Sequence, residues 1–209
     1  MKLIKTLIFF IACSYTVAAQ SDFGTWLVYK NNAKLSDKFT FNNMFQYRSF
    51  EADLDDDHLL ITSGFSYALS ENVTAGAGYR FLDAKNNFLE HGMYQSLAIK
   101  SKLNKVKITN KFMIEERWIN NNLQLRYRAG VDFGFPLSEK VDLVLSEEVF
   151  LMNQGNNFNQ NRITVKTNFN LSDSFKLSTG LMHWQFSNLH RWVAQVVLVH
   201  NLDFRKNKN

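Results

Sequence analysis

Residues 123–141 read LQLRYRAGVDFGFPLSEKV, and this stretch decides the fold. Apolar side chains occupy every odd position from Leu123 to Phe133, whereas the even positions hold polar residues or glycine, among them Arg126 and Arg128. Strict alternation predicts a β-strand with one apolar and one polar face. The stretch ends in Leu137-Ser138-Glu139-Lys140-Val141, a turn signal, because serine side chains bond to nearby backbone groups.

The turn signal recurs along the chain. Leu35, Leu69, Leu103, Leu137 and Leu171 each precede a Ser or Asn, and consecutive leucines are 34 residues apart. Half of this spacing covers one strand and one connection and predicts strands of about 10 to 13 residues, whereas strands of soluble proteins have about five or six. A strand that crosses a bilayer at a tilt needs about 9 to 11 residues. The repeat therefore favours membrane-spanning strands.

Reading the alternation between the turns gives eleven strands. Their predicted ranges are 23–35, 38–50, 58–69, 73–82, 91–103, 106–118, 123–137, 140–152, 159–171, 174–186 and 191–204. Bacterial single-chain barrels have even numbers of antiparallel strands, so we expect 10 to 12 strands and favour twelve. The fold class is all-β: an antiparallel transmembrane β-barrel with short periplasmic turns and longer external loops, closed because open edges in lipid leave backbone groups unpaired. A soluble β-sandwich is the alternative.

The N-terminal sequence predicts that the protein is exported. Lys2 and Lys5 precede an apolar run, and Val17-Ala18-Ala19 has the small residues of a cleavage site, so residues 1–19 are expected to be a cleaved signal peptide. A lipoprotein signal acylated at Cys13 is the rival. Residues 20–204 then form the barrel and residues 205–209 a basic C-terminal tail. The expected location is the outer membrane of a Gram-negative cell.

Charge excludes a nucleic-acid partner. The chain has 24 Lys and Arg against 19 Asp and Glu, but five of the bases lie in the two ends, at Lys2, Lys5, Arg205, Lys206 and Lys208. Residues 20–204 are therefore neutral, with 19 bases and 19 acids, and lack the uncompensated basic cluster that nucleic-acid binding needs. Outer-membrane lipid is the expected partner, small solutes are conceivable cargo of the lumen, and the barrel is expected to be a monomer.

Aromatic residues are placed toward both ends of the predicted strands, as in the interfacial belts of membrane barrels. The predicted belt residues are Trp26, Phe39, Tyr47, Tyr79, Trp118, Phe133, Phe169, Phe175, Trp192 and Phe204. Two acids, Glu116 and Glu147, fall on the apolar face. Glu116 is close to a strand end, and we expect a β-bulge to shift the alternation at Glu147.

The polar faces predict a charged lumen. Its expected members are Arg48, Arg80, Lys111, Glu115, Arg117, Arg126, Arg128, Asp132, Glu148, Arg162 and Lys166. A barrel of this size is narrow enough for long side chains to pair across it, so the lumen is interpreted as a charge-filled structural core. A narrow, anion-preferring pore lined by arginines is the functional alternative.

No catalytic, metal or cofactor site is predicted, and the protein is not expected to be an enzyme. A lipid-acting enzyme in a small barrel is the alternative, which needs a Ser nucleophile beside a His base. His58, His91 and His190 lie near the predicted loops, but none is two residues from a Ser on the same strand face. The acidic segment 51–58 lacks the glycine and the final glutamate of an EF-hand loop, so its capacity for a divalent cation stays open.

Several short motifs follow one another in an order that resembles a known family. They are Gly24-Thr25-Trp26-Leu27-Val28-Tyr29, Lys34-Leu35-Ser36-Asp37-Lys38-Phe39, Gln46-Tyr47-Arg48, Ala77-Gly78-Tyr79-Arg80, Glu90-His91, Glu115-Glu116-Arg117-Trp118, Gln160-Asn161-Arg162 and Asn201-Leu202-Asp203. Together they resemble the domain of unknown function 2490 family of Gram-negative outer-membrane proteins, from Gly24 to Phe204. The resemblance implies an outer-membrane barrel with no established activity and no catalytic residues.

Overall fold

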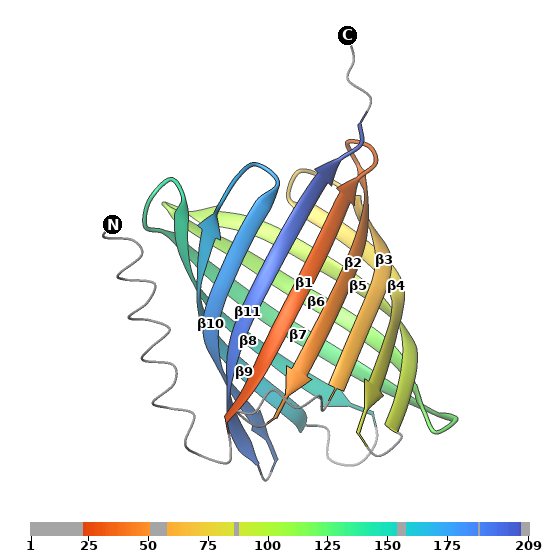
Figure 1. The fold of residues 1–209 in the computed structure, drawn as a ribbon. Coiled ribbons are helices and arrows are strands. Elements are labelled where there is room, and N and C mark those ends of the chain that lie inside the picture. The colour runs from red at the N-terminus through yellow and green to blue at the C-terminus, as the bar shows by residue number, and fades with distance from the viewer. Residues whose placement is uncertain (1–22, 51–57, 86–87, 154–157, 188, 206–209) are drawn as a thin grey trace.

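In the computed structural model, which describes residues 23–50, 58–85, 88–153, 158–187 and 189–205, the chain is a closed β-barrel (Figure 1). The strands are β1 Phe23–Lys34, β2 Phe39–Ser49, β3 His58–Ala68, β4 Val73–Ala84, β5 Phe88–Leu103, β6 Val106–Ile119, β7 Asn122–Pro136, β8 Val141–Met152, β9 Phe158–Asn170, β10 Phe175–Phe186 and β11 His190–Asp203. The barrel prediction is confirmed, and every predicted strand boundary lies within three residues of the observed one.

The preference for twelve strands was wrong, because the described residues form eleven strands and these close the barrel. Each strand pairs antiparallel with its neighbour in sequence, except that β1 and β11 run in the same direction and pair in parallel from Phe23↔Trp192 to Lys34↔Asp203. An odd number of alternating strands must bring the first and last together in this way. The parity rule applies to fully antiparallel barrels and does not hold here.

Side chains reinforce this parallel seam, whose pairing is slightly weaker per residue than antiparallel pairing. The Asn32 amide donates to Asn201 Oδ1 at 2.9 Å, and the Tyr29 hydroxyl lies 3.1 Å from His200 Nδ1. Beyond the strand end, Arg205 contacts Asp37 at 2.8 Å. Asp203 and Asp37 raise the pKa of Arg205 above its ordinary value, so the guanidinium stays charged and ties the last residues to the first turn.

The repeated turns have a common geometry. In four of them, the nitrogen of the leucine bonds to the carbonyl of the residue four positions later, as from Leu35 to Phe39 at 2.9 Å. In three of these turns the serine that follows the leucine accepts two backbone N–H groups through Oγ, as from Phe39 N to Ser36 Oγ at 3.0 Å, and Ser138 accepts one. Asn104 replaces this serine between β5 and β6, and its φ of 54° allows a shorter turn. This rim is called the turn end.

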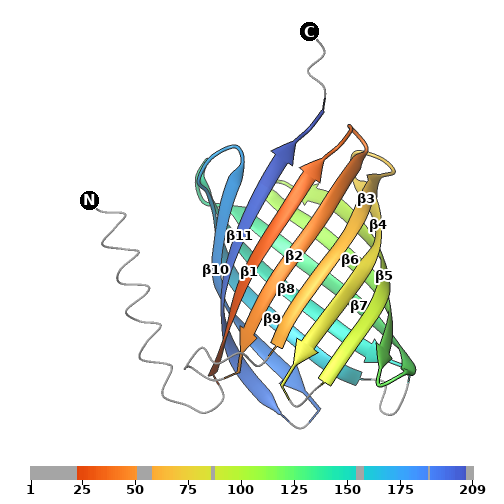
Figure 2. The same cartoon turned by 45° about the vertical axis from the view of Figure 1, so that its right-hand side comes forward.

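The opposite rim, the loop end, carries the remaining connections. The turn end is at the top of Figure 1, and the strands tilt between the two rims in both views (Figure 2). Strand alternation gives the barrel an apolar outer wall: Leu27, Phe45, Phe65, Met93 and Ile163 are among its exposed side chains. Within the described part of the chain, no helix is long and apolar enough to cross a membrane.

Candidate functional site

The lumen is the candidate site, because the inward faces of the strands collect the charged side chains. The structure places all eleven predicted lumen residues on these inward faces. They separate along the barrel axis into two groups. Arginines and glutamates, most of them with buried side chains, lie toward the loop end, whereas lysines and aspartates, of which Lys111 is the more exposed at 47%, lie toward the turn end.

The loop-end group is named the arginine plug. It comprises Arg48, Arg80, Glu90, Glu115, Arg117, Arg126, Arg128, Glu148 and Arg162 together with the aromatic residues Trp26, Phe150 and Trp184. Glu90 is its most enclosed carboxylate, with a fully buried side chain. Arg80 donates to one oxygen of Glu90, and Arg117 donates Nε to it at 2.8 Å and Nη2 to the other oxygen.

Glu115 continues the network around the lumen. Its side chain is 2% exposed and accepts Nε of Arg126 at 2.5 Å and Nη1 of Arg128 at 3.1 Å. Arg128 also donates to Glu148, with Nη2 at 2.6 Å, and so bridges two carboxylates. The ion pairs thus connect β4, β5, β6, β7 and β8 without interruption. Pairing of this kind is required, since a buried charge without a partner costs several kcal/mol.

Aromatic rings complete the plug where carboxylates are too few. Arg162 lies over three rings, 4.4 Å from the centroid of Phe150, 4.9 Å from Trp184 and 5.1 Å from Trp26. Arg48 lies 4.3 Å from the Trp26 ring. Two glutamine oxygens, those of Gln46 and Gln160, accept Nη2 of Arg48 and of Arg162. The quadrupoles of the rings and these amides stabilise the arginines in excess of the three glutamates.

The assignment of Trp26 to an aromatic belt was wrong. Its side chain is 3% exposed and points inward, edge-on to Trp184 with ring centroids 5.1 Å apart. The register explains the difference: Trp26 is directly opposite the inward Arg48 on β2, so both project from the same face of the sheet. Because side chains alternate along a strand, Val28 and Lys30 of β1 point into the barrel as Trp26 does.

The other predicted belt residues lie on or beside the outer wall. Six are exposed, namely Phe39, Tyr79, Phe133, Phe175, Trp192 and Phe204, and three are half-buried, namely Tyr47, Trp118 and Phe169. Phe39 packs against Phe65 and Tyr67 of β3, with centroids 5.6 and 5.8 Å away. Trp118 stacks on His91 at 5.8 Å.

The turn-end group is named the lysine vestibule and is defined by Lys30, Lys111, Asp132 and Lys166. Lys111 pairs with Asp132, and 47% of the Lys111 side chain is exposed although it faces the barrel interior. Nearer the rim, Lys107 Nζ lies 3.2 Å from Asp142 and is 61% exposed. The inward lysines at the turn end are therefore far more exposed than Glu90 and Glu115 of the arginine plug.

Sequence reasoning missed four members of these two groups, and also the glutamine that accepts a hydrogen bond from Arg162. Glu90 was predicted to end a loop, whereas β5 begins at Phe88 and carries Glu90 into the lumen. Lys30, Phe150 and Trp184 follow the inward alternation of β1, β8 and β10, and that alternation was the signal that could have found them. Gln160 lies two residues before Arg162 on β9, so the same alternation places it on the inward face.

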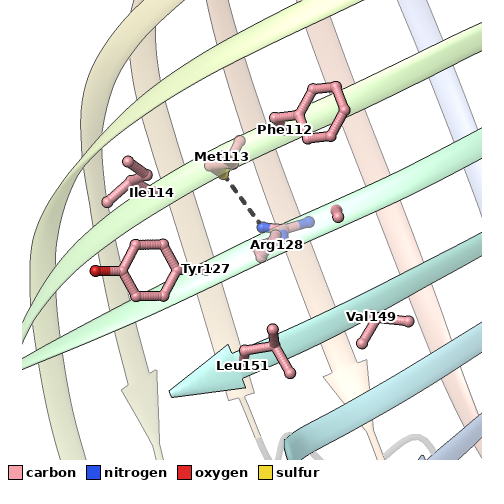
Figure 3. A pocket seen from close by; sticks show the side chains of 8 residues that line it. Phe112, Met113, Ile114, Tyr127, Arg128, Val149 and Leu151 are labelled. Atoms are coloured by element: carbon pink, nitrogen blue, oxygen red, sulfur yellow. Dashed lines mark hydrogen bonds between the residues drawn. The ribbon is translucent and has the colours of Figure 1, made fainter. Parts of the chain in front are cut away.

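The outer wall has one polar contact and one hollow that bear on the predictions. Glu147 points outward and accepts the amide of Asn161 at 3.2 Å. The bulge expected at Glu147 was wrong, because the register of β8 and β9 shifts only between Phe150 and Leu151. A shallow apolar hollow of about 200 Å³ lies over β6 to β8, where the small Ala129 stands between Phe112 and Val149 (Figure 3).

Two further histidines pack against aromatic rings. His183 lies 4.9 Å from Trp192 between ring centroids, and His200 stacks on Phe175 at 4.3 Å. In the described ranges, no group of three or more His, Cys, Asp or Glu side chains could hold a metal ion. The signal peptide, most of the acidic segment 51–58 and residues 206–209 lie outside the described residues.

Comparisons with known proteins identify a family and little else. A search of curated proteins gives no match. A solved structure described as the siderophore receptor PirA from Pseudomonas aeruginosa is similar at 12% identity and a TM-score of 0.29, over 77% of this chain. The chain spans only 35% of that receptor. Residues 23–195 match the family described as "Protein of unknown function (DUF2490)", and the chain belongs to this family.

Proposed function

We propose that the protein is an outer-membrane β-barrel with a structural role, whose lumen is closed at the loop end by the arginine plug. The observation that carries the proposal is the burial of Glu90 and Glu115, which are 0% and 2% exposed although they face the interior. An aqueous channel through the barrel would leave such inward carboxylates in contact with water. The plug therefore fills the lumen as a polar core.

The outer wall supports a membrane location. Its exposed side chains are mainly large and apolar, and a sheet that closes on itself has no unpaired edge, as a bilayer requires. Exposed aromatic residues stand toward both rims, with Phe133 near the turn end and Trp192 near the loop end. Acyl chains of the lipid are the expected neighbours of this wall, including the hollow beside Ala129. The proposal contains no catalytic role and no second subunit.

Conductance of the refolded protein in planar bilayers tests the closed lumen. The wild-type barrel is expected to insert without discrete conductance steps. Glu115→Ala removes a carboxylate shared by Arg126 and Arg128 and is expected to loosen the plug and produce steps. Asp132→Ala, in the lysine vestibule, is the matched control and should stay silent. Porin-sized steps from the wild type would overturn the proposal.

One observation favours a narrow anion-preferring pore as second candidate. The plug holds six arginines against three glutamates, an excess of positive charge of the kind that selects anions. In that case the wild type gives small, anion-selective currents, and neutralising Arg117 and Arg126 reduces the selectivity. Silence of the wild type and of this double variant would exclude the pore.

A further inference from the structure

Three lysines from separate strands converge in the vestibule. Lys30 of β1, Lys111 of β6 and Lys166 of β9 all occupy inward positions in the turn-end half of their strands, as the register places them. Their charges act on one another and on Asp132, which pairs with Lys111. β1, β6 and β9 are not neighbours in the sheet, and the convergence therefore arises from closure of the barrel.

The positive charge of this region is only partly balanced. Asp132 is the near carboxylate, and it pairs with Lys111. Glu148, the next acid toward the loop end, is already held by Arg128 at 2.6 Å and faces Arg162 at 3.9 Å. Among the described residues, neither Lys30 nor Lys166 has a carboxylate within ion-pair distance. Asp132 and Glu148 act on Lys30 and Lys166 only from beyond ion-pair distance, so three ammonium groups share two carboxylates, one of which is already held by Arg128.

Glycines stand opposite two of the vestibule lysines. Lys111 is directly opposite Gly130, and Lys166 is directly opposite Gly180. A Cβ added at Gly180 would lie 2.5 Å from Cβ of Lys166, so glycine is what leaves space for the lysine stem. Lys30 is exposed to solvent although it points inward. Hydrated ammonium groups exchange water for a ligand more readily than buried ones do.

The approach from the turn end is lined with further lysines. The inward positions near this rim include Lys34, Lys100, Lys102, Lys107 and Lys176, whereas the acids there are Asp142 and Asp203. Walls of low dielectric concentrate the field of such charges along the opening. A small anion is therefore drawn inward from the turn end, and the same field repels cations.

We propose that the lysine vestibule is a binding site for a small multivalent oxyanion, of the phosphate or pyrophosphate class, that enters from the turn end. Ammonium groups bind phosphate oxygens as point charges and tolerate several orientations of the ligand, which suits a cluster on three strands. The ligand is a soluble anion and not a lipid headgroup, because the lysines point away from the outer wall. Asp132 orients Lys111 through their ion pair.

The inference rests on the proposed function in one respect. The arginine plug closes the loop end, so the anion enters and leaves by the same opening. The two claims nevertheless fail separately: conductance through the wild type would disprove the closed lumen without abolishing anion binding, and absence of binding would leave the closed lumen intact.

Isothermal titration of the full-length protein, refolded in a non-ionic detergent, with inorganic pyrophosphate tests the site. The test variant combines Lys30→Gln, Lys111→Gln and Lys166→Gln. The control variant combines Lys38→Gln, Lys105→Gln and Lys140→Gln, which remove the same charge from the short turns outside the lumen. Chloride at matched ionic strength reports non-specific binding. Heat-dependent gel mobility verifies that each protein is folded.

The expected result is saturable binding of one pyrophosphate per barrel by the wild type and the control, and at least about tenfold weaker binding by the test variant. Equal loss in both variants would mean general charge attraction and would overturn the site. Absence of saturable binding to the folded wild type would overturn it as well. If the triple test variant does not fold, the single variant Lys30→Gln, at a position without an ion pair among the described residues, replaces it under the same criteria.

Discussion

The two ends of the lumen use different cations on the same inward face of the same strands. Toward the loop end the bases are arginines, stacked on Trp26, Phe150 and Trp184 and paired with glutamates. Toward the turn end they are lysines in contact with water. Guanidinium is weakly hydrated, planar and able to bond several partners, whereas ammonium is strongly hydrated. The difference teaches that arginine suits the ion-paired loop end of this lumen and lysine the more exposed turn end.

Removal of a carboxylate should affect the two ends most unequally. Glu90→Gln leaves Arg80 and Arg117 buried without their shared acid, and we expect a loss of about 3–5 kcal/mol in the free energy of unfolding. Urea unfolding of the detergent-solubilised barrel, followed by tryptophan fluorescence, measures the loss. Asp132→Asn in the vestibule is the matched variant, for which less than about 1 kcal/mol is expected because water solvates Lys111. Equal losses would contradict the division into a dry and a wet end.

Truncation of an aromatic ring should come next in size. Trp26→Ala removes a buried ring that contacts Arg48, Arg162 and Trp184, and we expect a loss of about 3 kcal/mol. Trp192→Ala on the outer wall, where the side chain is 42% exposed, is the control and should cost clearly less. Midpoints of thermal unfolding compare the two variants. A larger effect at Trp192 would restore Trp26 to the aromatic belt.

Exchange of one cation for the other tests the chemical basis of the comparison. Arg162→Lys keeps the charge but loses the planar group that lies over three rings, and a loss of about 1–2 kcal/mol in stability is expected. The reverse exchange, Lys111→Arg, should be nearly neutral because 47% of the Lys111 side chain is exposed and arginine can keep the pair with Asp132. Urea midpoints of both variants decide. Identical penalties would show that charge alone matters.

The smallest effect is expected from removing vestibule charges. Lys30→Gln relieves repulsion from Lys111 and Lys166, and stability should change by no more than about 0.5 kcal/mol, in the stabilising direction at low salt. Unfolding at low and high salt measures this change. A destabilised variant would mean that Lys30 has a structural partner and that the vestibule is part of the core.

Much of this fold could be predicted because alternation and turns are local properties. The strand ranges follow from period two and from the leucine–serine turns, whose Oγ bonds to backbone nitrogens are formed within four residues. The same alternation put eleven charged side chains on one face. Which of them pair could not be predicted, since Glu115 meets Arg128 diagonally, across strands, only after the register is known.

The errors have physical reasons as well. Trp26 was assigned to the aromatic belt because tryptophan is common there. An indole can equally well stack under an arginine inside a barrel, as Trp26 does under Arg48. Twelve strands were favoured by a rule for antiparallel closure, and no short-range pattern reveals that Phe23–Lys34 and His190–Asp203 pair in parallel. Contacts between the first and last strands depend on closure of the whole sheet, so they cannot be predicted from the local sequence pattern.

The parallel seam determines where the described chain can be re-joined. Phe23 lies at the loop end and Arg205 beyond the turn end, so these two positions are on opposite rims of the barrel (Figure 1). A circular permutant that links them needs a crossover of a dozen or more residues along or through the wall, as any connection between parallel neighbours does. In a barrel with an even number of strands, a short turn would suffice. The odd number of strands therefore makes circular permutation of this barrel difficult.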